Sequence, residues 1–357
     1  MAYVEFSRSK LRSNVAFLND LFGIHQVHWG VVTKLLCGNR KYIEELVQAG
    51  LTELHDSRIS NLKTIKMINP DIQTVYIKPP SSQVIKNLVR YADVSFNTQL
   101  PTIRQISAET KKQGKTHKII IMIELGDLRE GVLGENLIEF YRSVFQLDSI
   151  QVIGLGANLN CLNGILPSTD KMIQLSLYKQ LIEATFKVKI PWISGGSSVT
   201  VPLLLRKSIP SGINHFRLGE TLFFGNDLIT GRTIRGMKPN LFTLHAEIVE
   251  MMNKPLVPFG ELGKNVAGEQ IQIDENDYGK TSCRALLDIG LLDVDPGDIR
   301  PLSKYVKIVG ASSDMISIDL GSNKGGLKLG DFISFHLNYM GVLKVMNSRY
   351  IEKRIVD

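Results

Sequence analysis

The stretch Val31-Val32-Thr33-Lys34-Leu35-Leu36-Cys37-Gly38-Asn39 places one lysine where a buried strand ends and a helix begins. Residues 27–33 are short, apolar and β-branched, which predicts a strand, and the turn residues at the end of the stretch lead into a helical pattern over residues 42–47. A lysine at the end of a buried strand is costly unless it is paired, exposed or chemically used. Taken alone, Lys34 is best explained as a side chain that reaches out to water.

Eight strands of this kind alternate with helices over roughly 200 residues. They are expected at residues 27–33, 53–55, 75–77, 94–96, 118–124, 150–155, 191–194 and 214–218. The apolar run at 118–124 indicates burial on both faces, as in a parallel sheet. The pattern predicts an α/β fold, a (β/α)8 TIM-like barrel over residues 7–235, with a doubly wound sheet as the alternative.

The pattern changes after about residue 235. Strands with turn signals between them are expected at residues 242–248, 285–289, 306–309, 315–318 and 332–337, without long helical patterns. We therefore expect a smaller, mainly β C-terminal domain over residues 236–357, to which a short strand within residues 1–6 could pair.

Composition excludes several classes of protein. A hydrophobic fraction of 43% with 22% charged residues is that of an ordinary globular chain. No apolar run is long enough for a membrane span, and the first residues do not resemble a signal peptide. The net charge of +7 is spread along the chain without interleaved aromatics, so neither nucleic acid nor membrane is expected as a partner. Three widely spaced cysteines indicate a reducing cytoplasm and no metal site.

Active sites of such barrels form at the carboxyl ends of the strands. The residues expected there are Lys34, His55, Asp56, Ser57, Arg58, Lys78, Asn97, Glu124, Arg129, Asn158, Asn160, Ser194, Gly195, Gly196, Ser197, Arg217 and Gly219. The Ser-Gly loop at 194–198 follows the seventh strand, and residues 217–221 follow the eighth. Barrels commonly bind phosphate between these two loops, because glycine lets backbone N–H groups approach an anion.

A phosphate site opposite a strand-end lysine suggests pyridoxal 5'-phosphate, whose aldehyde forms an imine with an amine. Arg217 would lie between these two anchors, near the ring of the cofactor. A cation close to the pyridine nitrogen opposes its protonation, which favours simple removal and return of a proton over transamination. The alternative for Arg217 is a surface ion pair.

Five segments resemble the fold-type III pyridoxal-phosphate enzymes, in the group of alanine racemase, and most closely its alanine/ornithine racemase subfamily. They are residues 32–39 (VTKLLCGN), 56–62 (DSRISNL), 154–161 (GLGANLNC), 194–198 (SGGSS) and 212–220 (GINHFRLGE). They occur in the family's order and cover the whole barrel, whereas the β domain matches more loosely.

The resemblance implies a set of roles and a head-to-tail homodimer in which each β domain completes the partner's site. Lys34 would form the imine with the cofactor and act as one acid/base. Asn158 would lie against the cofactor ring and Arg129 near its phenolic oxygen. Ser194 and the backbone of Gly219 and Glu220 would hold the phosphate, Arg217 would contact the pyridine nitrogen, and Asp314 would contact the substrate. The chemistry of Asp56, Ser57 and Arg58 is left open.

One departure from the family concerns the second acid/base. Residues 288–296 (DIGLLDVDP) match a segment in which alanine racemases carry a catalytic tyrosine, and Leu291 stands in its place. Racemisation by two bases needs a proton carrier on each face of the planar carbanion. Candidates for this role are Asp293, Asp295, Cys283 and Tyr339. An acidic turn explains the aspartates equally well.

The sequence therefore predicts a racemase that interconverts the L and D forms of a free amino acid. The acidic run at 288–298 suggests ornithine or lysine over alanine. The alternatives are a pyridoxal-phosphate homeostasis protein without catalysis, which the missing tyrosine favours, and a fold-type III decarboxylase or aldolase.

Overall fold

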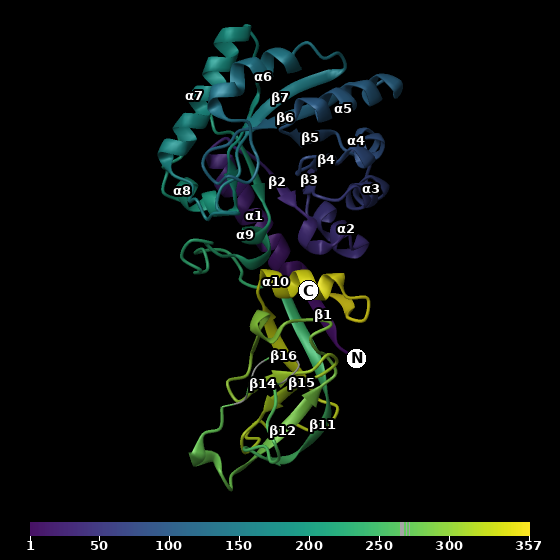
Figure 1. The fold of residues 1–357 in the computed structure, drawn as a ribbon, viewed down its shortest axis with the longest axis vertical. Helices are drawn as coiled ribbons and strands as arrows, with labels where there is room; N and C mark the ends of the chain where they lie inside the picture. Colours follow the sequence, from purple (N-terminus) through teal and green to yellow (C-terminus); the bar gives the residue numbers. More distant parts are fainter. Residues whose placement is uncertain (265–267, 269, 271) are drawn as a thin grey trace. The chain divides into compact units, whose positions relative to one another are not determined.

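The computed structural model describes residues 1–264, 268, 270 and 272–357. The chain forms two compact units, one made of Ser9–Pro239 and the other of Met1–Arg8 with Asn240–Asp357 (Figure 1). Within the described ranges, no helix combines the length and the apolar character needed to cross a membrane.

The first unit is built on a parallel sheet whose strands follow the order β8-β7-β6-β5-β4-β3-β2-β10-β9. The strands are β2 (His28–Val32), β3 (Glu53–Asp56), β4 (Gln73–Tyr76), β5 (Val94–Asn97), β6 (His117–Met122), β7 (Ile150–Gly156), β8 (Trp192–Ser194), β9 (Gly196–Ser197) and β10 (His215–Leu218). At one end of this order β8 pairs with β7, and at the other end β9 pairs with β10. Only Gly195 separates β8 from β9 in the chain, so this segment joins the two ends of the sheet. The expected TIM-like barrel is confirmed.

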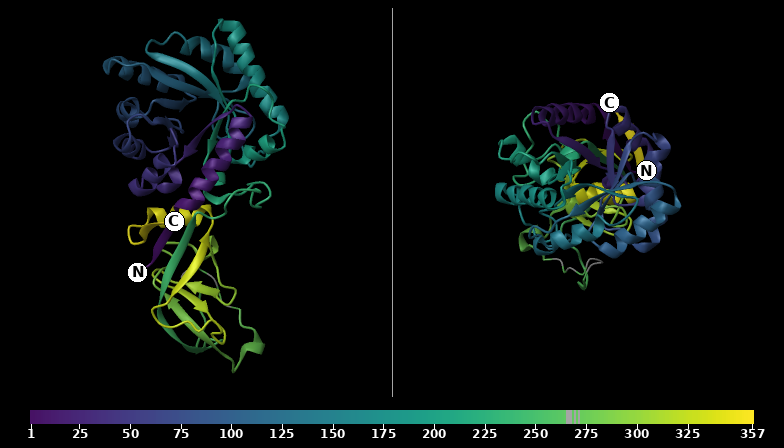
Figure 2. Two further views of the ribbon diagram at one scale, coloured as in Figure 1. Left: turned by 180° about the vertical axis from the view of Figure 1, so that it is seen from behind. Right: turned by 90° about the horizontal axis from the view of Figure 1, so that it is seen from above.

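Helices follow most of the strands and lie on the outside of the sheet (Figure 2). They are α1 (Arg8–Ile24), α2 (Arg40–Gln48), α3 (Ile59–Ile68), α4 (Ile85–Tyr91), α5 (Leu100–Lys112), α6 (Leu137–Val144), α7 (Thr169–Phe186), α8 (Val201–Leu205) and α9 (Glu220–Phe224). All eight predicted strands are present, the seventh as β8, and Gly195 separates β8 from the additional short strand β9.

The interior of the barrel has an apolar half and a polar half. Strands β4 to β7 contribute a buried cluster made of Val75, Val94, Phe96, Ile120, Met122 and Ile153. Strands β3, β8 and β10 instead contribute buried polar side chains, among them His55, Ser194, His215 and Arg217. Buried polar groups need hydrogen-bond partners, so this half is where specific side-chain chemistry is concentrated.

The second unit is an antiparallel sheet with the strand order β13-β16-β11-β12-β15-β14. Its strands are β11 (Phe242–Pro255), β12 (Thr281–Leu287), β13 (Ile299–Pro301), β14 (Lys307–Ala311), β15 (Ile316–Asp319) and β16 (Phe332–Leu337). The N-terminal strand β1 (Tyr3–Ser7) pairs with β11 and, in parallel, with β17 (Glu352–Val356), as the sequence suggested.

This unit is mainly β, as expected, and also contains helix α10 (Tyr339–Asn347), which the sequence patterns did not indicate. The helix begins at Asn338, whose side chain accepts a hydrogen bond of 2.8 Å from the Gly341 N–H. Gly341 in turn lies against a backbone carbonyl of Asp298, where a Cβ would be only 2.7 Å from the oxygen. A short cap and a close backbone approach are weak signals in a single sequence.

Candidate active site

Lys34 begins a short 3₁₀ turn (Lys34–Leu36) directly after β2. Its side chain is exposed, whereas Leu35 and Leu36 are buried and anchor the turn. The turn closes with a hydrogen bond of 3.2 Å from the Cys37 N–H to the Lys34 carbonyl, and Cys37 has a left-handed φ of 50°. The amine of Lys34 is thus held on a rigid, buried base at the carboxyl end of its strand.

Asp56 ties this turn to the neighbouring strand. Its buried carboxylate accepts hydrogen bonds from Thr33 Oγ1 at 2.8 Å, from the Arg58 N–H at 2.9 Å and from Asn61 Nδ2 at 3.1 Å. Burial raises the pKa of Asp56, and these hydrogen bonds oppose that rise. The structure therefore gives Asp56 a supporting role beside Lys34, which sequence reasoning left unassigned.

Arg217 lies on β10, immediately beside β2, where it pairs with Gly30 in the sheet register. Its guanidinium is buried, and it donates to the Ser194 carbonyl at 2.5 Å, to Ser194 Oγ at 2.6 Å and to the Ala157 carbonyl at 2.7 Å. Burial lowers the pKa of Arg217 to about 10. Its burial rules out the surface ion pair considered above.

The loops after β9 and β10 are joined by Ser198. Its Oγ accepts hydrogen bonds from the Gly219 N–H at 3.1 Å and from the Thr221 N–H at 3.2 Å. A Cβ on Gly219 would lie 3.3 Å from Val32, which places this loop next to the strand that carries Lys34. Burial raises the pKa of Glu220, and the positive charge of Lys34 acts in the opposite direction. The two predicted phosphate loops thus meet beside Lys34.

The loops after β6 and β7 carry Arg129 and Asn158. Asp127 connects these loops, because its carboxylate accepts from backbone N–H groups of the second loop, among them that of Leu162 at 2.9 Å. Arg129 forms an ion pair with Glu130, which raises the pKa of Arg129, and its Nη1 lies 2.6 Å from Cys161 Sγ. Asn158 is half-buried and follows Ala157, whose carbonyl binds Arg217.

In the second unit, the turn that contains Leu291 packs against the segment that contains Asp314. The Leu291 N–H donates to the Ser312 carbonyl at 3.0 Å, and a Cβ on Gly290 would lie 2.3 Å from the Ser313 carbonyl oxygen. The Asp314 side chain is exposed. The residue in the expected tyrosine position and the predicted substrate contact are therefore neighbours.

The candidates for the second acid/base lie in hydrogen-bonded or half-buried positions. Asp293 accepts a hydrogen bond of 2.6 Å from Ser348 Oγ, and Asp295 accepts one of 2.9 Å from the Gly297 N–H. These contacts agree with the alternative of an acidic turn. Cys283 lies on β12 and Tyr339 begins α10, and both are half-buried.

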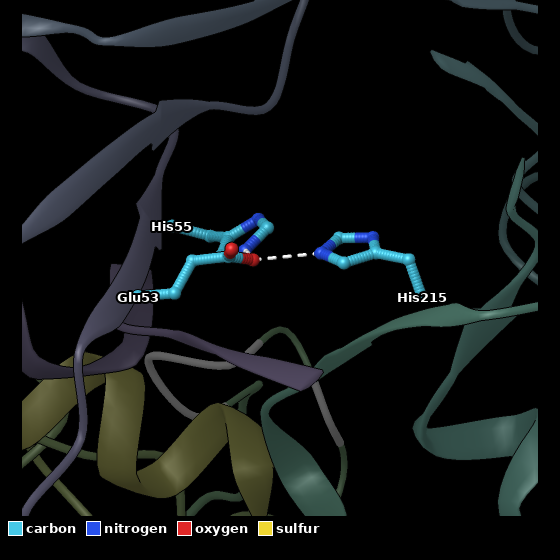
Figure 3. A group of neighbouring side chains, drawn as sticks. All are labelled: Glu53, His55 and His215. Carbon is cyan, nitrogen blue, oxygen red and sulfur yellow. Dashed lines mark hydrogen bonds and ion pairs between the residues drawn. The ribbon is translucent and has the colours of Figure 1, made fainter. Parts of the chain in front are cut away.

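Sequence reasoning missed one buried group, formed by Glu53 and His55 on β3 and His215 on β10 (Figure 3). In the sequence His55 is only a strand-end residue, and neither Glu53 nor His215, which belongs to the 212–220 segment, has an assigned role. Their signal in the sequence is a polar residue at an inward position of a short, otherwise buried strand. Glu53 and His215 are 162 residues apart, so no local pattern connects them.

The barrel unit therefore brings an exposed amine, a buried guanidinium and two glycine-containing loops to the carboxyl ends of adjacent strands. Such a set suits an anionic ligand that also carries a group reactive toward an amine.

Comparison with known proteins agrees with this geometry. Residues 7–227 match the family model described as alanine racemase, N-terminal domain. The chain is 33% identical to an ornithine racemase of Acetoanaerobium sticklandii over 98% of both chains, and 31% identical to a lysine racemase of Thermotoga maritima over 90% of this chain and 89% of the relative. Its fold is also that of an alanine racemase of Clostridium difficile 630, with a TM-score of 0.76, 14% identity and coverage of 99% and 95% of the two chains. The chain belongs to the alanine racemase N-terminal domain family.

Proposed function

We propose that this chain is an amino-acid racemase that uses pyridoxal 5'-phosphate. The observation that carries the proposal is the placement of Lys34 and Arg217 on the paired strands β2 and β10, with the loop of Ser198 and Gly219 beside them. The residues present fit the cofactor, because an exposed amine, a buried permanent cation and a turn rich in backbone N–H groups correspond to its aldehyde, its ring nitrogen and its phosphate.

When bound, the cofactor acidifies the Cα–H bond of the amino acid joined to it. Lys34 would hold the aldehyde end and take or return the proton on one face of the substrate. Arg217 can only donate hydrogen bonds, so it keeps the ring nitrogen unprotonated. This weakens the electron sink and favours proton return at Cα over transamination. Gly219 and Glu220 are proposed to hold the phosphate through their backbone, and Arg129 and Asn158 to bind the other side of the ring. The hydroxyl of Ser194, expected to contact the phosphate, is buried and bonded to Arg217 and His215 instead.

The substrate is proposed to be a basic amino acid such as ornithine or lysine. Two relatives that align over nearly all or most of the chain carry the names ornithine racemase and lysine racemase. A head-to-tail homodimer would bring the exposed Asp314 of one β domain to the partner's barrel, where its carboxylate could pair with a side-chain ammonium. The opposite-face acid/base would come from the same region. The three cysteines are few and widely spaced, which fits the proposed cytoplasmic location.

A panel of L-amino acids tested in heavy water examines this proposal. A racemase incorporates deuterium at Cα and forms both enantiomers, with ornithine or lysine turned over faster than alanine. The Lys34→Ala variant should lose turnover together with the absorbance typical of the lysine-bound cofactor. Deuterium exchange with none of the amino acids would favour a cofactor-binding protein, and carbon dioxide release without racemisation would favour a decarboxylase. Exclusive turnover of alanine would refute the assigned substrate class.

A further inference from the structure

The polar half of the barrel contains a continuous chain of hydrogen bonds that ends at Arg217. Glu53 Oε1 lies 2.7 Å from His215 Nε2, His215 Nδ1 lies 2.6 Å from Ser194 Oγ, and Ser194 Oγ lies 2.6 Å from Arg217 Nη1. Figure 3 shows the carboxylate of Glu53 pointing at the ring of His215. Three separate strands, β3, β8 and β10, supply these four residues.

The direction of each hydrogen bond follows from the chemistry at the two ends. Arginine has only donors, so Ser194 Oγ accepts from Arg217 and its own proton is free to be donated to His215 Nδ1. A carboxylate has only acceptors, so the proton of the imidazole must lie on Nε2, where it points to Glu53. One neutral tautomer of His215 therefore satisfies every donor and acceptor in the chain. Burial lowers the pKa of His215, which agrees with a neutral ring.

Glu53 carries the negative charge of this chain. The hydrogen bonds from His215 and His55 outweigh the cost of burying its carboxylate, so its pKa lies well below the usual range. Its second oxygen accepts a hydrogen bond of 2.6 Å from Gln73 Nε2. Arg217, by contrast, donates only to neutral oxygens and forms no ion pair within the part of the chain that the structure describes. A buried cation needs a counter-charge: the charge of Glu130 acts on Arg217 through space, and Glu53 is connected to it by hydrogen bonds through two neutral groups.

We propose that Glu53, His215 and Ser194 are positioning residues that fix the guanidinium of Arg217 and balance its charge through this relay. The inference rests on the proposed function for the contact of Arg217 with the cofactor ring, whereas the relay itself is a property of the protein without cofactor.

Packing around His215 supports a fixed ring. Trp192 stacks on it with ring centroids 4.4 Å apart, and the ring of His55 lies nearly parallel to it with centroids 5.7 Å apart. Gly30 makes room for the cluster, because a Cβ there would lie 2.3 Å from His55 Nε2 and 2.5 Å from Glu53 Oε1. The Nε2 atoms of His55 and His215 lie 2.6 and 2.7 Å from the same oxygen of Glu53. These are hydrogen-bond distances, so hydrogen bonds from the two rings are sufficient to hold the three side chains together.

His55 provides a matched control for this relay. It is as deeply buried as His215 and contacts the same oxygen of Glu53, but it does not lie between Glu53 and Arg217. Glu53→Gln removes the charge and keeps the shape, and His55→Gln removes one partner of the same carboxylate. If the cluster only stabilises the barrel, both variants should lose thermal stability and activity in parallel.

The test combines a measurement without cofactor and one with it. In the ¹⁵N NMR spectrum of the apoprotein, His215 should show the tautomer protonated at Nε2. With the best amino-acid substrate, Glu53→Gln should lower kcat at least tenfold with KM changed less than threefold, while His55→Gln keeps kcat within threefold of wild type.

Several results would overturn the relay. They are the Nδ1 tautomer of His215, equal losses of kcat in the two variants, or a stoichiometric metal ion in the purified protein. The NMR measurement decides the case if Glu53→Gln does not fold. It also separates the two proposals, because a chain that racemises no amino acid but shows the Nε2 tautomer would refute the function and leave the relay standing.

Discussion

Gly30→Ala is the smallest change that tests how tightly the polar half of the barrel is packed. Gly30 lies inside β2, opposite Arg217 in the sheet register. A Cβ at this position would lie 2.3 Å from His55 Nε2, 2.5 Å from Glu53 Oε1 and 2.6 Å from His55 Cδ2. These atoms belong to a buried hydrogen-bonded pair, so the added methyl group must separate it.

Three contributions set the expected loss of stability. Forcing a methyl group into a packed interior costs about 1–3 kcal/mol. Breaking the 2.6 Å hydrogen bond between His55 and the charged Glu53 costs about 1.5–3 kcal/mol. Replacing glycine lowers the entropy of the unfolded chain and returns about 0.4–1 kcal/mol. The free energy of unfolding of the barrel should therefore fall by about 2–5 kcal/mol.

Urea denaturation followed by tryptophan fluorescence measures this loss. Both tryptophans, Trp29 and Trp192, belong to the barrel unit, so the signal reports on that unit alone. Gly23→Ala is the matched control, because beyond the backbone of its own helix no atom of the described residues lies within 4 Å of the added Cβ, and alanine favours a helix such as α1. A Gly30→Ala midpoint equal to that of the control would refute the packing described here.

Three further predictions concern pH, the loops and the substrate. Burial lowers the pKa of His117 from 6.5 to about 4, so the unfolded chain takes up a proton before the folded chain does as the pH falls. Between about pH 7 and about pH 5 the free energy of unfolding of the barrel should therefore fall by about 2 kcal/mol, and the His117→Gln variant should not show this fall. Urea midpoints at both pH values measure the difference. Ser198→Ala removes the acceptor of two backbone N–H groups and should weaken the binding of pyridoxal phosphate by the apoprotein about tenfold in a fluorescence titration; unchanged affinity would contradict it. Asp314→Asn should raise KM for a basic amino acid about tenfold and leave KM for alanine unchanged, whereas a parallel rise for both would argue against a contact with the side-chain ammonium.

The barrel was predictable because its signals are local. Each strand is a short apolar run, and each helix repeats apolar residues at helical spacing, so the order of the elements follows from neighbours in the chain. The position of Lys34 after β2 follows in the same way, since an apolar strand must end where a cation and a turn begin. Helix α10 was missed because nine residues and one asparagine cap give too little periodicity.

The partners of the site residues follow from the closed sheet. Arg217 could be named from its motif, but its burial and its contacts with Ser194 and Ala157 depend on β8 and β7 being next to β10 at the right register. The same holds for Asp56, whose carboxylate reaches Thr33 only because β2 and β3 pair.

The sequence by itself determined the class of fold, the family and the lysine at the centre of the proposed chemistry, because apolar periodicity and short motifs are properties of consecutive residues. The tertiary structure alone decided what surrounds that lysine and its cofactor partner Arg217. Glu53, His215 and Ser194 have no common motif, and they form one hydrogen-bonded chain only when the barrel closes and brings strands from distant parts of the sequence together. Burial then fixes the protonation states of these residues and the directions of their hydrogen bonds, because a buried polar group without a partner destabilises the fold.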